Sequence, residues 1–225
     1  MNDLRNGQRA TKAVSSISSR RKNARKAGDD DYEKRRAKLV EVAALVFREK
    51  GFNAANVDDI AKRAGIDRAS IYYYYKGKKE LFREMVEQAI TGNVERAEEI
   101  MAAPDSPGIK LRRLITTLFQ SYERHYPYLY VYVQEDMTRL MSDQSAWSRN
   151  IRTLSKRFDL ATTGIIEDGL ETGEFRSSGD AKVLAAGVIG MCNWSHRWFE
   201  PGRHSAEAVA TALADMVLQG LGAHE

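Results

Sequence analysis

Apolar side chains recur every three or four residues along most of the chain, which is the spacing of an amphipathic α-helix. The stretch 56–79 predicts two short helices joined by a tight turn. Asn56 is a favourable N-cap for the first helix, and Gly65 supplies the left-handed residue that ends it. The second helix is expected over residues 68–75, capped by Asp67. The apolar stripe of the first helix consists of Val57, Ile60, Ala61 and Ala64.

The same periodicity extends on both sides of this pair. An amphipathic helix within residues 36–55 precedes it, closed by Gly51 and Phe52, and a long helix over residues 79–101 follows, with Gly92 near its middle. Pro104 and Pro107 then interrupt the pattern. Beyond them only helices are expected, although residues 128–133 also have strand propensity. Their expected ranges are 109–126, a helix starting at 127, a long helix from about 147 to Gly173, 180–201 and 205–221.

Composition and length narrow the class of protein. The chain has 225 residues, of which 43% are hydrophobic and 29% charged, so it can bury a sizeable core. No run of 18 apolar residues occurs, so we expect no membrane span. The basic N-terminus lacks a following apolar segment, which argues against a secretory signal. A single cysteine, Cys192, allows no internal disulfide, and a cytoplasmic location is therefore expected.

Positive charge is concentrated at the N-terminal end. Residues 1–30 carry 8 Lys/Arg against 3 Asp/Glu, and residues 31–80 carry 12 against 8, whereas the remainder is net acidic. We expect residues 1–30 to be a disordered basic arm, because they lack an apolar period. Such an arm can lie along DNA phosphates, although an inert tail is the alternative. This charge polarity suits a protein that holds DNA at one end.

The predicted second helix would present a basic and hydroxyl-rich outer face. A short helix of this kind, beside a rigid partner helix, fits the DNA major groove. A helical hairpin with a merely solvated polar face is the alternative reading. The outer face is expected to show Arg68, Ala69, Ser70, Tyr73 and Tyr74.

The flanking helices favour DNA binding. The ordered set RRAKLVEVAALVFREKGFNAANVDDIAKRAGIDRASIYYYYKGKKELF resembles the N-terminal DNA-binding domain of the TetR family of bacterial transcription regulators. The resemblance implies phosphate contacts by Asn56, Tyr72 and Lys78. It further implies base reading by Arg68, Ala69, Ser70 and Tyr73. Asp67, Gly77 and the pair Tyr74-Tyr75 depart from the residues common in the family at those positions.

The resemblance also implies the architecture. We expect an all-α protein with a three-helix helix-turn-helix domain (residues 31–80), joined by a long helix to a C-terminal helical ligand-binding and dimerisation domain (residues 81–225). The last two helices carry small residues that permit close helix approach, among them Ala186, Gly187 and Gly190. In the family these helices form a homodimer interface, and an intramolecular core is the alternative. Two-fold symmetry would match a palindromic double-stranded operator.

The C-terminal half contains a mixture of aromatic and polar side chains that a plain core does not need. As a set they indicate an effector cavity, whereas for any one of them ordinary core packing is the favoured alternative. An apolar small molecule with a polar handle is the expected ligand. The segments 134–143, 169–175 and 193–202 resemble a TetR subgroup that senses acyl-CoA thioesters in fatty-acid or steroid breakdown. The candidate lining residues are Tyr122, Tyr126, Tyr130, Gln134, Met137, Trp147, Asn150, Phe158, Asn193 and Trp194.

Catalysis is not expected. The four histidines and one cysteine show no metal-ligand or nucleophile spacing, and no glycine-rich phosphate loop occurs, so we expect no catalytic residue, metal or cofactor. The leading hypothesis is a homodimeric, ligand-responsive transcriptional repressor. A ligand-independent, architectural DNA-binding dimer is the alternative.

Overall fold

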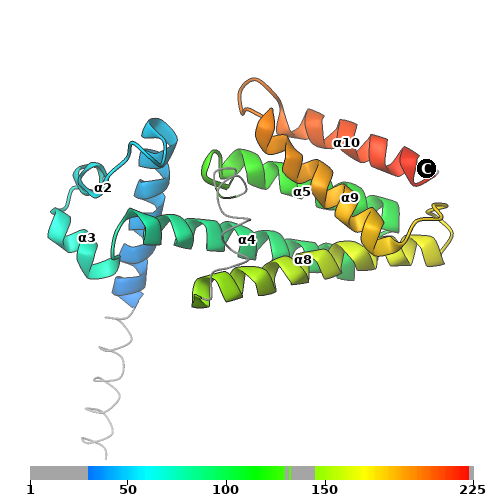
Figure 1. Cartoon of the computed structure of the whole chain (residues 1–225), viewed down its shortest axis with the longest axis horizontal. Coiled ribbons are helices and arrows are strands. Elements are labelled where there is room, and N and C mark those ends of the chain that lie inside the picture. The colour runs from blue at the N-terminus through cyan, green and yellow to red at the C-terminus, as the bar shows by residue number, and fades with distance from the viewer. Residues whose placement is uncertain (1–29, 130–131, 133–144, 223–225) are drawn as a thin grey trace, which may run out of the picture.

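The computed structural model describes residues 30–129, 132 and 145–222. Within these ranges the protein is helical and contains no β-strand, which confirms the predicted all-α class. A first helix over residues 30–50 precedes α2 (Val57–Ala64) and α3 (Arg68–Tyr74). The long α4 (Lys78–Ala102) leads away from these three helices to the remaining ones (Figure 1). Those are α5 (Pro107–Arg124), α8 (Ala146–Glu171), α9 (Ala181–Trp194) and α10 (Ala206–Gly220). The predicted basic arm lies outside the described residues.

Local capping explains the two short helices. The Asn56 side chain accepts a hydrogen bond from the Asp59 amide, and the Asp59 carboxylate accepts one from the Asn56 amide, which forms a complete capping box. Gly65 ends α2 in the left-handed conformation (φ 68°), and the Asp67 side chain then accepts from the Ser70 amide at the start of α3. Ile71 is fully buried beneath α3. The predicted helix-turn-helix is therefore present.

The helices α4 and α8 pack side by side and run in the same direction (Figure 1). Three side-chain contacts join the two helices, and these contacts follow one another in the same order along both. The Trp147 indole donates to the carbonyl of Arg83 (3.2 Å), the Asn150 amide donates to Glu87 (2.6 Å), and Arg157 forms a two-pronged ion pair with Glu98 (2.8 and 2.7 Å). These links stabilise α4 as the connection between the two parts of the chain.

The predicted boundaries of α5 and α9 need correction. Pro107 begins α5, where its missing amide costs nothing, and the helix ends at Arg124 because the chain turns before Pro127. The helix α9 ends at Trp194 and not near Pro201, since a short 3₁₀ turn, η1 (Ser195–Arg197), follows it. The amide of Phe199 closes this turn on the Ser195 carbonyl (2.8 Å), and the buried Phe199 ring packs against Phe119 on α5.

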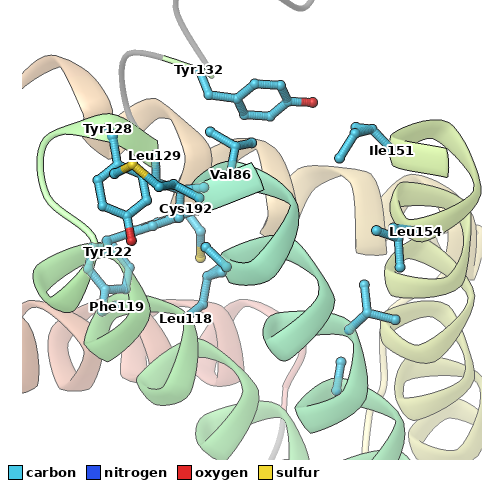
Figure 2. Packing of buried hydrophobic residues seen from close by; sticks show 14 of the residues in the cluster. Val86, Leu118, Phe119, Tyr122, Tyr128, Leu129, Tyr132, Ile151, Leu154 and Cys192 are labelled. Carbon is cyan, nitrogen blue, oxygen red and sulfur yellow. The ribbon is translucent and has the colours of Figure 1, made fainter. Parts of the chain in front are cut away.

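The C-terminal core lies between α4, α5, α8 and α9. Figure 2 shows Val86 of α4, Leu118 and Phe119 of α5, Leu154 of α8 and Cys192 of α9 converging on it. The helix α10 covers the other side of α5. No helix among the described residues is long and apolar enough to cross a membrane.

Candidate nucleic-acid interface and effector pocket

Tyr73 is the most prominent side chain on α3. It is 73% exposed, although the edge of its ring contacts Tyr32 on the first helix, with centroids 5.9 Å apart. Tyr74, one residue later, is half-buried and packs at 5.0 Å against the same Tyr32 ring. Tyr73 is thus exposed to solvent and supported from below by the Tyr32 ring, whereas Tyr74 is partly covered by that ring.

Arg68, at the start of α3, is held in place by neighbours. Its guanidinium forms an ion pair with Asp58 on α2 (3.1 Å), donates to the Tyr72 hydroxyl (3.1 Å) and lies over the Tyr72 ring. The hydrogen bond with Tyr72 and the charge of Asp58 both raise the pKa of Arg68, so its guanidinium stays protonated. Ala69 and Tyr72 are exposed beside it, and Ser70 is half-buried. A DNA base or phosphate at this site would compete with Asp58.

Asn56 lies exposed at the N-terminus of α2. The Lys50 ammonium contacts its capping partner Asp59 at 2.5 Å, and this contact is the main reason that the pKa of Asp59 is lowered. The helix N-terminus carries unpaired amides and the positive end of the helix dipole, an arrangement that accepts phosphate oxygens. The position of Asn56 therefore agrees with its predicted phosphate contact, which stays a prediction.

Lys78 begins α4, as the resemblance implies, and its side chain is turned toward the helix-turn-helix, while its predicted phosphate contact stays a prediction. Its ammonium donates to three backbone carbonyls in the loop before α2, those of Phe52 (2.8 Å), Asn53 (3.0 Å) and Ala55 (2.8 Å). It also lies 4.9 Å from the centre of the Phe52 ring. A lysine has three N–H donors, and all three are used here. Lys78 thus fastens the start of α4 to the helix-turn-helix, and a phosphate contact would require it to release carbonyls.

Tyr75 anchors the other end of α3. Its ring is buried, its hydroxyl donates to the Arg36 carbonyl (3.2 Å), and the Arg36 guanidinium lies over the ring and pairs with Glu84 of α4. Burial of the Tyr75 phenol, the largest cause, raises its pKa to about 12. The first helix, α3 and α4 are consequently held together at one point.

A hollow of about 320 Å³ lies between α4, α5, α8 and α9. Its wall is mostly apolar, and its volume lies at the lower end of the range for small-molecule sites. The Tyr122 hydroxyl donates to Oδ1 of Asn193 across the wall (2.6 Å). The apolar lining residues are Ile90, Val94, Leu118, Leu129, Phe158 and Ile189, and the polar ones are Asn93, Tyr122, Tyr132, Ser155, Asp159 and Asn193. We call this hollow the bundle pocket.

Three of the predicted effector residues, Tyr122, Phe158 and Asn193, meet in the bundle pocket. Trp147 and Asn150 do not line it; as described above, they fasten α8 to α4. Trp194 is 58% exposed at the end of α9 and does not line it either, and Tyr126 packs at the edge of the core. The other candidates, Tyr130, Gln134 and Met137, lie outside the described residues.

The sequence reasoning missed four polar residues of the pocket, Asn93, Tyr132, Ser155 and Asp159. Ser155 and Asp159 lie one helical turn apart on α8, and Asp159 directly follows the predicted Phe158. Both are exposed, which places them at the mouth of the pocket. Partial burial of the Asp159 carboxyl nevertheless raises its pKa. The helical spacing of Ser155, Phe158 and Asp159 on one side of α8 was the sequence signal that could have identified Ser155 and Asp159.

The described residues contain no cluster of His, Cys, Asp and Glu side chains that could hold a metal ion. The thiol of Cys192 is buried, and that burial raises its pKa to about 12. A thiol in this state is a poor nucleophile.

Comparisons with known proteins agree with this geometry. Residues 39–85 match the model of the bacterial regulatory proteins of the tetR family, and residues 104–221 match the tetracyclin repressor-like C-terminal domain. The HTH-type transcriptional repressor KstR2 of Mycolicibacterium smegmatis is 28% identical over 83% of this chain and 90% of its own length. The relatives found in this way are named as regulators of transcription.

Solved structures give the same result. The TetR family regulator PfmR of Thermus thermophilus superposes with a TM-score of 0.70 and 31% identity, over 81% of this chain and 98% of its own. The ketosteroid regulator KstR2 of Mycobacterium tuberculosis gives 0.71 and 28%, over 85% and 96%. FadR of Bacillus subtilis, solved with stearoyl-CoA, gives 0.64 over 82% and 98% at 20% identity, which shows a shared fold alone.

These matches confirm the predicted fold and the predicted function of a ligand-responsive regulator, whereas the individual DNA and effector contacts stay predictions. Regulators of this class bind DNA operators and small-molecule effectors. Because its helix-turn-helix and its helical C-terminal domain each match a model of the family, the chain belongs to the TetR family of bacterial transcription regulators.

Proposed function

We propose that the protein is a homodimeric repressor that leaves its operator when a small, mostly apolar effector enters the bundle pocket. One observation carries this proposal: Ile90, Asn93 and Val94 of α4 form a wall of the pocket, and the same helix is fastened at its start to the helix-turn-helix through Lys78. A change in the pocket is thereby linked to the position of α3. The effector must favour the arrangement that does not bind DNA.

The DNA contacts of this proposal are the exposed residues of α3 and the start of α2. Tyr73, Arg68 and Ala69 would face base edges, because they are exposed on the helix that a major groove accepts. Asn56 and Tyr72 would contact phosphates. Ser70 and Tyr74, both half-buried, have less surface to offer. For Lys78 we propose that positioning of the helix-turn-helix outweighs direct phosphate binding.

The dimer face of this proposal lies on α9 and α10. On α9, the exposed positions include Val183 (67% exposed), Ala186, Gly187 and Gly190, and on α10 Met216 is 54% exposed. A Cβ added at Gly187 or Gly190 would meet nothing within 4 Å in a single chain. Exposed apolar side chains beside small residues are typical of surfaces that a second helix pair covers.

An acyl-CoA thioester is our specific candidate for the effector. The likeness to the ketosteroid transcriptional regulator KstR2 supports an effector from lipid or steroid breakdown. The pocket, at about 320 Å³, is small for a ligand of the size of an acyl-CoA. It would therefore take part of the acyl group, and the coenzyme would stay outside.

The operator and the effector can be tested in sequence. Bound duplexes would first be selected from random DNA, and a fluorescent copy of the selected site would then report release on addition of CoA thioesters, with free CoA as the control. We expect a palindromic site, with half-sites about 34–36 Å apart, and release by a thioester but not by CoA. Selection of no common sequence would overturn the proposal.

The dimer can be tested by the substitution Gly190→Trp. The added side chain leaves the backbone into open space in one chain but would collide with a second helix packed there, so sedimentation should show a monomer with much weaker operator binding. Glu167→Trp, at an exposed position on α8, is the matched control and should remain a dimer. A Gly190→Trp protein that stays dimeric would rule out this face.

A further inference from the structure

The charges that line the bundle pocket are unbalanced. Its lining contains one carboxylate, that of Asp159, and no lysine, arginine or histidine among the described residues. Partial burial raises the pKa of the Asp159 carboxyl, and no ion pair with this carboxylate forms among the described residues. A carboxylate that approached this mouth would meet a like charge in partly desolvated surroundings, which is unfavourable.

The other polar groups of the pocket show what it can recognise. Because the Tyr122 hydroxyl donates to Oδ1 of Asn193, the amide N–H groups of Asn193 are left as donors on α9. Asp159 and Ser155 lie on α8, on a different wall, and the ionised Asp159 carboxylate can only accept. The pocket therefore offers an acceptor at its mouth and a donor on another wall, with apolar surface between them.

We infer that the bundle pocket selects effectors whose entering part carries a hydrogen-bond donor, such as a hydroxyl or an amine, and rejects those that end in a carboxylate. This inference rests on the proposed effector function of the pocket and narrows its ligand class. An acyl-CoA effector would meet the requirement with a hydroxylated acyl group, and a free fatty acid would not. Asp159 is the residue that sets the preference.

Three probes with one apolar skeleton test this inference: phenylbutanol, phenylbutylamine and phenylbutyrate. Their dissociation constants for the full-length protein would be measured by calorimetry, and their effect on operator binding by fluorescence anisotropy. We expect the alcohol and the amine to bind at least about tenfold more tightly than the carboxylate. Whichever of phenylbutanol and phenylbutylamine binds more tightly, tighter binding of both than of phenylbutyrate supports the requirement for a donor.

Asp159→Asn supplies the decisive comparison. The asparagine Oδ1 still accepts from an alcohol, so binding of phenylbutanol should change little, whereas phenylbutyrate should gain about tenfold and phenylbutylamine should lose affinity. Because the charged form of Asp159 is disfavoured by partial burial, this variant should melt no lower than the wild type. Glu167→Gln on the same helix is the matched control and should leave the three constants unchanged.

The outcomes separate the two proposals. If phenylbutyrate binds the wild type as tightly as phenylbutanol, or if Asp159→Asn alters all three probes equally, the donor preference is wrong although the pocket is still an effector site. If none of the probes binds, the pocket is not the effector site, and both proposals fail. If the probes bind with the expected preference but the operator stays bound, the preference stands and the proposed regulation fails.

Discussion

The guanidinium of Arg48 donates a hydrogen bond to the backbone carbonyl of Arg124, 76 residues away in the sequence (3.1 Å). Arg48 lies near the end of the first helix, and Arg124 is the last residue of α5. A helix C-terminus carries partial negative charge, so a cation is favourable there. Tyr122, which lines the bundle pocket, lies in the same final turn. This contact is a second connection, besides α4, between the pocket and the DNA-binding helices.

We predict that Arg48→Met weakens the coupling between effector and operator. The methionine keeps much of the length of the side chain but removes the donor and the charge. Operator release by an active effector, measured by anisotropy, should become at least about fivefold less effective. Arg48→Lys retains a cation and should keep most of the coupling. Equal release from all three proteins would show that α4 alone carries the signal.

His125, the C-cap residue of α5, predicts a pH dependence of stability. Burial, together with the charges of Arg124 and Arg48, lowers its pKa to about 4 from 6.5. The unfolded chain therefore takes up a proton before the folded one does. Stability should be full above pH 6.5 and should fall as the pH drops from 6.5 to 4. Because the ring is partly exposed, we expect about 1–2 kcal/mol from this source.

The substitution His125→Gln isolates this effect. Urea unfolding at several pH values between about 7 and 4 should give a shallower loss of stability for the variant than for the wild type. The carboxylates of the chain titrate in both proteins, so the effect of His125 is the difference between the two curves. Parallel curves would contradict the assignment to His125.

We predict that Lys78→Met mainly lowers stability. Three loop carbonyls lose their shared donor, and this should cost about 1–3 kcal/mol in urea unfolding. Operator affinity should fall as well, because α2 loses its fixed position. The salt dependence of binding decides between the two roles: a steep dependence equal to that of the wild type supports positioning, whereas a slope reduced by about one supports a direct phosphate contact.

Tyr73→Ala should affect recognition without affecting folding. The side chain is 73% exposed, so we expect its removal to change stability by no more than about 0.5 kcal/mol. Affinity for the selected operator should fall by about 1–3 kcal/mol, while affinity for random duplex should stay the same. Tyr32→Leu is an informative companion, because it removes the ring that supports Tyr73. An equal loss on operator and random DNA would place Tyr73 on the backbone and not on a base.

Periodic burial made most of the helices predictable. The limits of α4 and α10 agree with the predicted ones to within one residue, because each has an apolar stripe and clear ends. The inward positions of Ile71 and Tyr75 follow from the same reasoning. The end of α9 was missed, since the turn at Ser195 depends on the contact between Phe199 and Phe119, which are distant in sequence.

The site was less predictable than the fold. Aromatic and polar side chains in the C-terminal half are common to pocket walls and to helix contacts, and the sequence does not separate Tyr122, which lines the pocket, from Trp147, which binds the backbone of α4. Lys78 is a further example. A lysine at a helix start suits a phosphate, but a loop with three inward carbonyls offers the same ammonium an internal partner.

The parallel packing of α4 and α8 has a mechanical consequence. Ile90, Asn93 and Val94 are the residues of α4 that face the bundle pocket. The contacts with α8 at Arg83, Glu87 and Glu98 hold α4 on either side of them. A helix held in this way cannot move as a whole. A ligand that pressed on it between these contacts would bend it and tilt its N-terminal end, which Lys78 joins to the helix-turn-helix.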